Sequence, residues 1–328
     1  MRIFLTGGTG LVGSHSARLF VEAGHEVVAL CRAGSDTAFL RGVGCALVEG
    51  DVCEDSKEIA PRMEGCTHVV HAAALVYSGD DLATMRAVNT LGTRNVLAAA
   101  AEVGVRHALH VSSVAVYGGT PGPVDENTAT DAEIGPQNHY ARSKREAEAE
   151  ARRVEVERGI PVTILRPASV YGERDRLLTP RVARLVRRPV SFFLGGGRNT
   201  ISTVYAGNVA EAVLLATEAA RGGTTYDVGM DHPLTQKEML VGIAAGMGYS
   251  PRLVPIPAAV VRAGAKILER LGVTPPGISG LPLTRVVQLA LAENPYQSRR
   301  LRDELGWDPS HRHGDALRRT GEWLIGAM

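Results

Sequence analysis

Apolar residues gather in six short runs along the chain, and longer stretches with helical spacing separate these runs. The runs cover residues 2–5, 25–30, 45–49, 68–74, 107–111 and 161–167. Between them, apolar positions recur three or four residues apart, as in residues 14–23, which is the spacing of one helix face. Short apolar runs that alternate with helical stretches are typical of βαβ units, whose helices cover both faces of a parallel sheet. The pattern therefore predicts an α/β fold with a doubly wound parallel sheet.

The turn between the first run and the first helical stretch carries three glycines, Gly7, Gly10 and Gly13. Gly7 permits a tight turn, Gly10 lets the backbone approach a pyrophosphate, and Gly13 lets the helix pack on the strand. The helix that follows directs free N–H groups and its positive dipole end at the phosphates. A strand before this turn and a helix after it are the context of a dinucleotide site, so we expect a Rossmann-type sheet that binds NAD(P).

The alternation of runs and helical stretches ends near residue 172, and residues 173–200 are rich first in arginine and then in glycine. We expect residues 1–172 to form the NAD(P)-binding Rossmann domain. Residues 173–328 are expected to form mainly a smaller C-terminal α/β domain that binds the substrate. Segments near 201–230, such as residues 224–228, are expected to complete the sheet of the first domain.

Residues at the ends of the second, third and fourth runs indicate the form of the cofactor. NAD-preferring units usually end the second strand with an acidic residue, but this chain has Arg32, which can pair with a 2′-phosphate. NADP is therefore favoured over NAD, with stacking of Arg32 on adenine or its plain solvation as the alternatives. Asp51 directly follows the third run, where it can accept from the adenine amino group or cap a helix. Small residues at 72–74 leave room for the cofactor.

Composition narrows the class of partner and the compartment. The chain has 36 Lys and Arg against 35 Asp and Glu, a formal net charge of +1, and no basic stripe, which argues against a nucleic-acid partner. Its 4 cysteines form no C-x-x-C pair, so no metal site is expected. We expect no signal peptide, and the sequence has no run of about 18 uncharged apolar residues, so we expect a cytoplasmic protein without a transmembrane segment.

Tyr140 and Lys144 form the sharpest chemical feature, because a spacing of four residues places both on one helix face. At about 4 Å and an effective dielectric constant near 20, their attraction is about 4 kcal/mol, or roughly three pKa units before desolvation. This attraction would bring the pKa of the Tyr140 phenol close to working pH, where a general acid/base is most useful. Ser113 follows the fifth run and is expected to hydrogen-bond the same substrate oxygen.

Five motifs occur in the order typical of one enzyme family, from the first run to residue 172. Together they resemble the extended short-chain dehydrogenase/reductase superfamily, which is the NAD-dependent epimerase/dehydratase superfamily. The resemblance implies a small-molecule substrate and a homodimer through the helices expected at 90–103 and 140–158. The motifs are the glycine turn at 6–13, the small-residue edge at 71–74, the serine pair at 112–113, Tyr140-x-x-x-Lys144, and Arg166-Pro167-Ala168-x-x-Tyr171-Gly172.

The same resemblance assigns roles to residues of this chain. It implies that Tyr140 is the catalytic acid/base, that Ser113 aligns the substrate oxygen, and that Lys144 binds the nicotinamide ribose and lowers the pKa of the tyrosine. It also identifies Asn89 as the buried helix asparagine of these folds. With the positions argued above, the expected cofactor contacts are Gly7, Thr9, Gly10, Leu11, Val12, Arg32, Asp51, Val52, Ala72, Ala73, Ala74, Asn89, Val111, Tyr140, Lys144, Pro167, Ser169 and Val170.

The branch of the superfamily decides the expected substrate. Residues 165–178 and 203–210 resemble the 3β-hydroxysteroid dehydrogenase branch, and Asn208 stands where sugar-nucleotide epimerases usually carry an acid. We expect an NAD(P)-dependent oxidoreductase that moves hydride between nicotinamide and a secondary alcohol or ketone of a largely apolar substrate. Such an enzyme is 3β-hydroxysteroid dehydrogenase-like or 3-ketoacyl/aldehyde reductase-like, with Tyr140 as general acid/base. The alternative is a nucleotide-sugar epimerase or dehydratase.

Three further segments admit two interpretations each. Residues 257–271 form an amphipathic helical pattern, expected as core or pocket wall, with a membrane surface as the alternative. Four arginines within residues 181–188 could bind a diphosphate or a carboxylate, and they favour the epimerase alternative, although such runs are more often exposed helix faces. His311-x-His313 has strand-like metal spacing and is expected to be a solvated loop.

Overall fold

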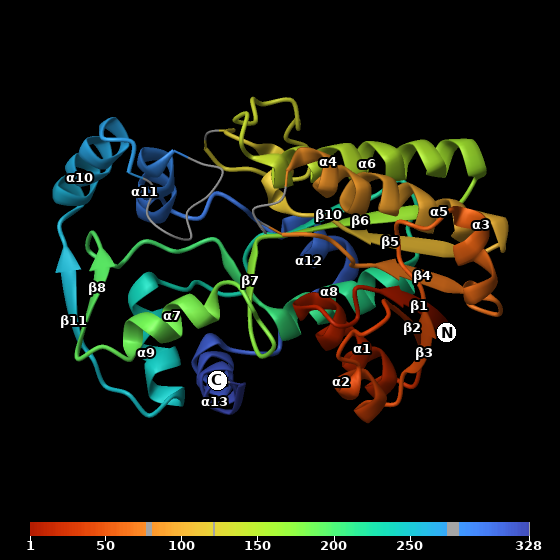
Figure 1. Ribbon diagram of the computed structural model, residues 1–328, viewed down its shortest axis with the longest axis horizontal. Coiled ribbons are helices and arrows are strands. Elements are labelled where there is room, and N and C mark those ends of the chain that lie inside the picture. The colour runs from red at the N-terminus through yellow and green to blue at the C-terminus, as the bar shows by residue number, and fades with distance from the viewer. Residues whose placement is uncertain (77–80, 121, 274–281, 328) are drawn as a thin grey trace.

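The computed structural model describes residues 1–76, 81–120, 122–273 and 282–327, and a seven-stranded sheet forms the middle layer of its right-hand half in Figure 1. The strand order is β3-β2-β1-β4-β5-β6-β10, and all six pairings are parallel. The predicted doubly wound parallel sheet is thus confirmed. The strands are β1 (Arg2–Thr6), β2 (Glu26–Cys31), β3 (Ala46–Glu49), β4 (His68–His71), β5 (His107–Val111), β6 (Val162–Pro167) and β10 (Thr225–Val228).

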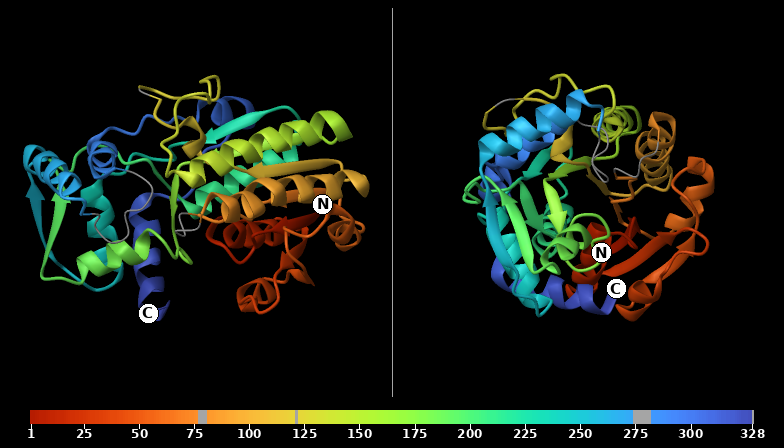
Figure 2. Two further views of the ribbon diagram at one scale, coloured as in Figure 1. Left: turned by 45° about the horizontal axis from the view of Figure 1, so that its top comes forward. Right: turned by 60° about the vertical axis from the view of Figure 1, so that its left-hand side comes forward.

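Helices cover both faces of this sheet because successive strand side chains point to opposite faces. In β1, Ile3 and Leu5 join the core beneath α1 and α8, whereas Phe4 joins the core beneath α3, α5 and α6. Figure 2 shows α5 and α6 on one side of the sheet and α1 on the other. These helices are α1 (Leu11–Glu22), α3 (Ser56–Ile59), α5 (Gly92–Glu102), α6 (His139–Arg158) and α8 (Ala206–Ala219).

Short elements connect the larger ones at the edges of the sheet. A π-helical turn, η2, precedes α5, and a 3-10 turn, η3, follows β5 after Ser112 and Ser113. The short elements are α2 (Ala38–Gly42), η1 (Ala60–Met63), α4 (Leu82–Met85), η2 (Arg86–Leu91), η3 (Val114–Tyr117) and α12 (Arg299–Leu305).

A second lobe packs around its own core beyond the carboxyl ends of the strands. Tyr171, Tyr205 and Ile243 lie in this core, which α7, α9 and α13 enclose. Two small parallel pairs, β7 with β9 and β8 with β11, belong to this part of the chain. Its elements are β7 (Ser169–Tyr171), α7 (Thr179–Val186), β8 (Val190–Leu194), β9 (Thr203–Tyr205), α9 (Gln236–Gly246), β11 (Arg252–Ile256), α10 (Ala258–Arg270), α11 (Leu283–Leu291) and α13 (His313–Ala327).

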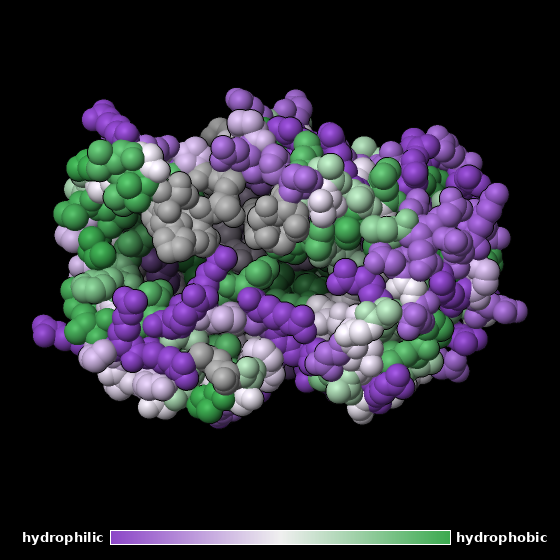
Figure 3. Space-filling view, viewed as in Figure 1, coloured by the Kyte–Doolittle hydropathy of each residue, from purple (hydrophilic) through white to green (hydrophobic). Residues whose placement is uncertain are grey.

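Helix α10 does not belong to the core as expected. Among its residues only Ala265 is buried, while Val260 is 60% and Ile267 56% exposed. Apolar residues accordingly gather on the surface over this helix in Figure 3. The expectation of a core helix is wrong because α10 packs against α11 rather than against the larger cores. Its role as a pocket wall stays a prediction.

Within the described ranges, no helix combines the length and the apolar character that a membrane crossing needs.

Candidate active site

The glycine turn between β1 and α1 needs glycine for steric reasons. A Cβ on Gly13 would lie 2.2 Å from the carbonyl oxygen of Gly7, and a Cβ on Gly7 would lie 2.5 Å from the backbone nitrogen of Ala73. Gly7 also has φ of 72°, which L side chains rarely adopt. Gly10 caps α1 without a side-chain hydrogen bond, so no cap side chain occupies the first N–H groups of the helix. This cradle fits the pyrophosphate of a dinucleotide.

The turn lies where the strand order reverses, between β1 and β4, which is where open α/β sheets bind ligands. The Thr6 hydroxyl lies 2.7 Å from Nδ1 of His71 and accepts the backbone N–H of Ala73 at 3.3 Å. These bonds hold the small-residue edge at 72–74 against the glycine turn. Figure 3 shows the surface hollowed between the two lobes, with apolar residues in the hollow.

Helix α6 carries Tyr140 and Lys144 on its buried face, with exposed fractions of 8% and 1%. Ser113 follows β5, and its side chain hydrogen-bonds Tyr140. The neighbouring Ser112 hydroxyl is buried and has no partner among the described residues. Lys144 Nζ donates to the carbonyl oxygen of Val111, at the end of β5, over 2.7 Å. The structure thus brings the three predicted catalytic residues to the carboxyl end of one strand.

The expected lowering of the Tyr140 pKa is wrong. Burial raises the pKa of this phenol, and the hydrogen bond from Ser113 only partly opposes the rise. Burial also lowers the pKa of Lys144 to about 8, although the carboxylate of Glu148 acts in the opposite direction. Desolvation disfavours the charged form of both groups and therefore outweighs the attraction that the spacing suggested.

Asn89 lies in the π-helical turn η2 and is fully buried. Its Oδ1 accepts the N–H of Leu75 at 2.7 Å, and its Nδ2 donates to the carbonyl of Leu75 at 3.0 Å and to the Ser143 hydroxyl at 2.9 Å. The Ser143 hydroxyl in turn donates to the carbonyl of Tyr140 at 2.9 Å. Asn89 thus ties the segment after β4 to the turn of α6 that carries Tyr140, and its contact with cofactor stays a prediction.

A buried charge network, which the sequence pattern did not predict, lies one turn further along α6. Arg166 donates Nε and Nη2 to the two carboxylate oxygens of Glu148, at 2.9 and 2.6 Å. Its Nη1 donates to the Tyr117 hydroxyl at 2.8 Å, which donates to Asp227 Oδ2 at 2.7 Å. Glu148 lies four residues after Lys144, so the helical spacing that paired Tyr140 with Lys144 could have identified it.

The remaining predicted cofactor contacts follow the carboxyl ends of the strands of the sheet. Arg32 is exposed just after β2, while Pro167 ends β6 and residues 169–170 begin β7. The carboxylate of Asp51 accepts the N–H of Cys53 at 2.9 Å, which is a local capping role. Its contact with adenine stays a prediction.

His313 is not part of a solvated loop, contrary to expectation. It is buried at the start of α13, with Nδ1 at 2.8 Å from the Tyr171 hydroxyl and Nε2 at 3.3 Å from Asp231 Oδ1. Asp231 Oδ2 also accepts from Asn208 Nδ2 at 2.7 Å, so His313 and Asn208 share this carboxylate. The histidine therefore joins α13 to β7 and to the residues that follow β10.

Comparison with known proteins decides the family. The family model described as "NAD dependent epimerase/dehydratase family" matches residues 3–229. The chain belongs to this family. It is therefore an NAD-dependent oxidoreductase of the extended short-chain dehydrogenase/reductase type.

Relatives of this family member include both reductases and epimerases. The 4-hydroxy-2-methyl-3-oxo-4-farnesyl-3,4-dihydroquinoline-1-oxide ketoreductase of Stigmatella aurantiaca is 30% identical over 334 residues, covering 100% of this chain and 99% of the relative. Human sterol-4-alpha-carboxylate 3-dehydrogenase, decarboxylating, is 27% identical over 332 residues, covering 97% and 87%. The solved UDP-glucose 4-epimerase of Thermus thermophilus, in complex with NAD, is 25% identical with a TM-score of 0.74, covering 100% of each chain.

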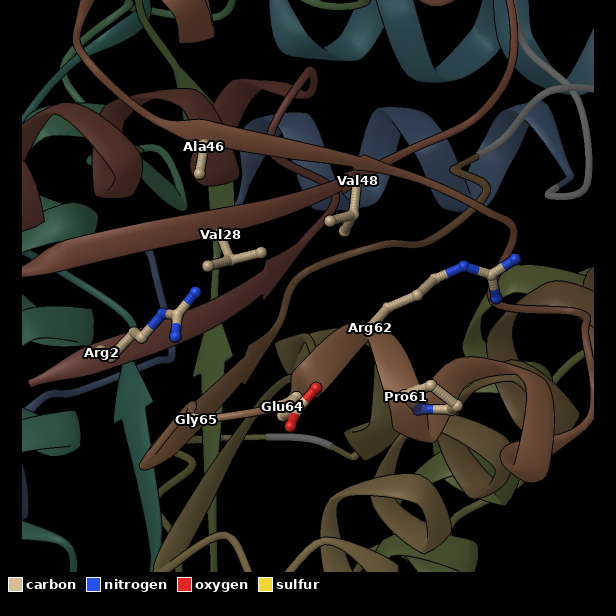
Figure 4. Close-up of a pocket in the computed structure, with 8 residues that line it drawn as sticks. All are labelled: Arg2, Val28, Ala46, Val48, Pro61, Arg62, Glu64 and Gly65. Carbon is tan, nitrogen blue, oxygen red and sulfur yellow. The ribbon is translucent and has the colours of Figure 1, made fainter.

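Two other features of this epimerase/dehydratase-family chain lie apart from the predicted catalytic residues. Arg181, Arg184, Arg187 and Arg188 are all exposed, on α7 and just after it, as expected of an exposed helix face. A pocket of ≈ 510 Å³ lies over β1, β2, β3 and η1 (Figure 4). It includes Arg2, the first residue of β1, whereas the glycine turn follows the other end of that strand. Neither the four arginines nor this pocket lies at the end of β5, next to Ser113 and Tyr140.

Proposed function

We propose that this chain is an NADP-preferring ketoreductase, which transfers hydride between nicotinamide and a secondary alcohol or ketone carbon of a largely apolar substrate. The observation that carries the proposal is the hydrogen bond between Ser113 and the buried Tyr140, beside Lys144. The apolar substrate is supported by the full-length similarity to the ketoreductase of a farnesylated quinoline and by the apolar hollow between the lobes. The exposed Arg32 after β2 supports NADP.

The state of Tyr140 favours the reductive direction. A phenol whose pKa is raised by burial keeps its proton at neutral pH, as a general acid must. When bound, the reduced nicotinamide would supply the hydride to the carbonyl carbon. Tyr140 then gives its proton to the carbonyl oxygen, which Ser113 holds by a hydrogen bond. The Lys144 ammonium stabilises the phenolate that remains until solvent returns the proton.

A Tyr140→Phe variant tests this role. Loss of a positioned general acid should lower turnover by about 10²- to 10⁴-fold, while cofactor affinity stays within about twofold because the ring and the helix remain. Turnover is followed by the absorbance of reduced nicotinamide with ketoacyl, prenylated aromatic and steroid ketones, and affinity by titration of cofactor fluorescence. Tyr249→Phe, a change on an exposed tyrosine, is the matched control. Near-native turnover of the Tyr140 variant would refute the assignment.

The second candidate is a nucleotide-sugar epimerase or dehydratase, which the solved epimerase with a TM-score of 0.74 favours. Such an enzyme recycles its cofactor, so UDP- or dTDP-sugars would be converted without net change in nicotinamide absorbance. Cofactor that survives purification together with sugar conversion would support this candidate. Net oxidation of added NADPH with an apolar ketone would exclude it.

A further inference from the structure

Arg174 has a strained backbone in the loop after β7. Its φ is 74°, and within the described ranges Ala220 is the one other non-glycine residue with positive φ. This left-handed region disfavours residues that carry a Cβ, and a glycine would adopt it freely. Such strain persists only where neighbouring contacts enforce it, and it gathers at ligand sites. The position of Arg174 therefore calls for a functional explanation.

Contacts on both sides of Arg174 hold the loop. The carbonyl oxygen of Glu173 accepts from His15 Nε2 at 3.0 Å, which ties the loop to the first turns of α1. The buried carboxylate of Asp175 accepts the N–H groups of Leu177 and Thr179, both at 2.7 Å, where α7 begins. Because these hydrogen bonds hold Glu173 and Asp175 in place, a shift of the loop cannot relieve the strain at residue 174.

The Arg174 side chain reaches the segment that follows β2. Its guanidinium carbon lies 4.4 Å from the centroid of the Phe39 ring. The carboxylate of Asp36 is near enough to stabilise the positive charge of the guanidinium. Asp36 itself accepts the N–H of Ala38 at 3.1 Å, at the start of α2. The Nε of Arg174 is buried and has no hydrogen-bond partner among the described residues. A buried guanidinium N–H without a partner is costly, so this group is suited to a ligand acceptor.

We propose that Arg174 binds the 2′-phosphate of NADP together with Arg32, and that this pair sets the preference for NADP over NAD. The adenosine ribose of a dinucleotide lies at the end of the second strand in sheets of this topology, which here is the segment that Arg174 reaches. A guanidinium that stacks on a ring keeps its in-plane N–H groups for a phosphate. The inference rests on the proposed preference for NADP, and Arg174 extends it to a residue outside the first βαβ unit.

The test compares binding of NADP, NAD and 2′,5′-ADP to purified protein by isothermal titration calorimetry. Arg174→Asn removes the guanidinium and leaves a residue that tolerates positive φ. Charge-assisted hydrogen bonds to a phosphate correspond to roughly a 10- to 100-fold change in affinity. We expect NADP and 2′,5′-ADP to bind that much more weakly, with NAD changed less than about twofold. Arg176→Asn, on an exposed arginine in the same loop, should change none of the three affinities.

Thermal unfolding separates ligand binding from a structural role. Arg174→Asn should unfold at the same temperature as wild type or higher, because backbone strain is relieved, and Arg174→Lys should keep part of the NADP affinity. Equal weakening of NADP and NAD, or no change in either, would overturn the role of Arg174. Tighter binding of NAD than NADP by wild type would instead refute the proposed cofactor preference.

Discussion

Asp227 offers a test of the buried charge network that joins α6, β6 and β10. It lies in β10, is fully buried, and accepts from the Tyr117 hydroxyl at 2.7 Å through Oδ2. Its Oδ1 has no hydrogen-bond partner in the part of the chain that the structure describes. Burial raises the pKa of this carboxyl from 3.8 to about 7, against the opposing hydrogen bond from Tyr117 and the charge of Arg166. The folded protein therefore binds a proton here that the unfolded chain releases near pH 4.

The sign of the effect follows from proton binding. Between the two pKa values the folded state holds more protons than the unfolded state, so the free energy of unfolding falls as pH rises. A difference of about 3 pKa units corresponds to about 4 kcal/mol over this interval. The contribution of Asp227 is complete below about pH 4 and is lost as pH rises through about 7. Asp227→Asn removes the titrating group and should remove this part of the pH dependence.

Urea unfolding followed by circular dichroism at several pH values between about 4.5 and 8 measures the effect. The free energy of unfolding of wild type should fall relative to Asp227→Asn by about 3 kcal/mol across this range. Asp303→Asn, on an exposed residue of α12, should follow the wild-type curve. Parallel curves for wild type and Asp227→Asn would refute the reasoning, because they would mean that the buried carboxyl takes up no extra proton on folding.

Two further substitutions test the glycine turn and the serine. Gly13→Ala would place a Cβ 2.2 Å from a backbone carbonyl oxygen of the turn. Cofactor affinity, measured by fluorescence titration, should therefore fall at least about tenfold. Gly314→Ala, which has open space around its Cβ, should bind the cofactor with normal affinity. Ser113→Ala removes the hydrogen bond to Tyr140, so turnover should fall about 10²- to 10³-fold while cofactor affinity stays within about twofold. Native cofactor affinity in the Gly13 variant, or near-native turnover in the Ser113 variant, would contradict these contacts.

The sequence predicted those features that depend on local pattern. Strand positions follow from short apolar runs, and the glycine turn follows from spacing, because a Cβ at Gly13 has no room whatever the distant residues do. The helix expected at 140–158 is α6, which begins at His139 and ends at Arg158 before Gly159. In each case neighbours within a few residues determine the outcome. Local spacing was therefore sufficient to predict the sheet and the position of Tyr140 and Lys144 on one face of a helix.

Long-range packing determined what the sequence did not predict. The pKa of Tyr140 depends on how completely other segments bury it, and an estimate from the spacing of two charges leaves this desolvation out. His313 contacts Tyr171, which lies 142 residues earlier, so its local spacing gave no sign of burial. The stacking of Arg174 on Phe39 likewise joins the loop after β7 to α2. None of these contacts leaves a periodic pattern in the sequence.

The buried face of α6 carries four contacts that bear on both the proposed chemistry and the stability of this protein. Successive turns of this helix present Tyr140 to Ser113, Ser143 to Asn89, Lys144 to the end of β5, and Glu148 to Arg166. A rotation or shift of α6 would disturb all four contacts together, because residues three and four apart share one face of a rigid helix. The buried pair of Glu148 and Arg166 is costly to desolvate, and two parallel hydrogen bonds specify its geometry. We therefore expect the pair of Glu148 and Arg166 to fix the position of α6, and with it the position of the Tyr140 hydroxyl relative to the substrate oxygen.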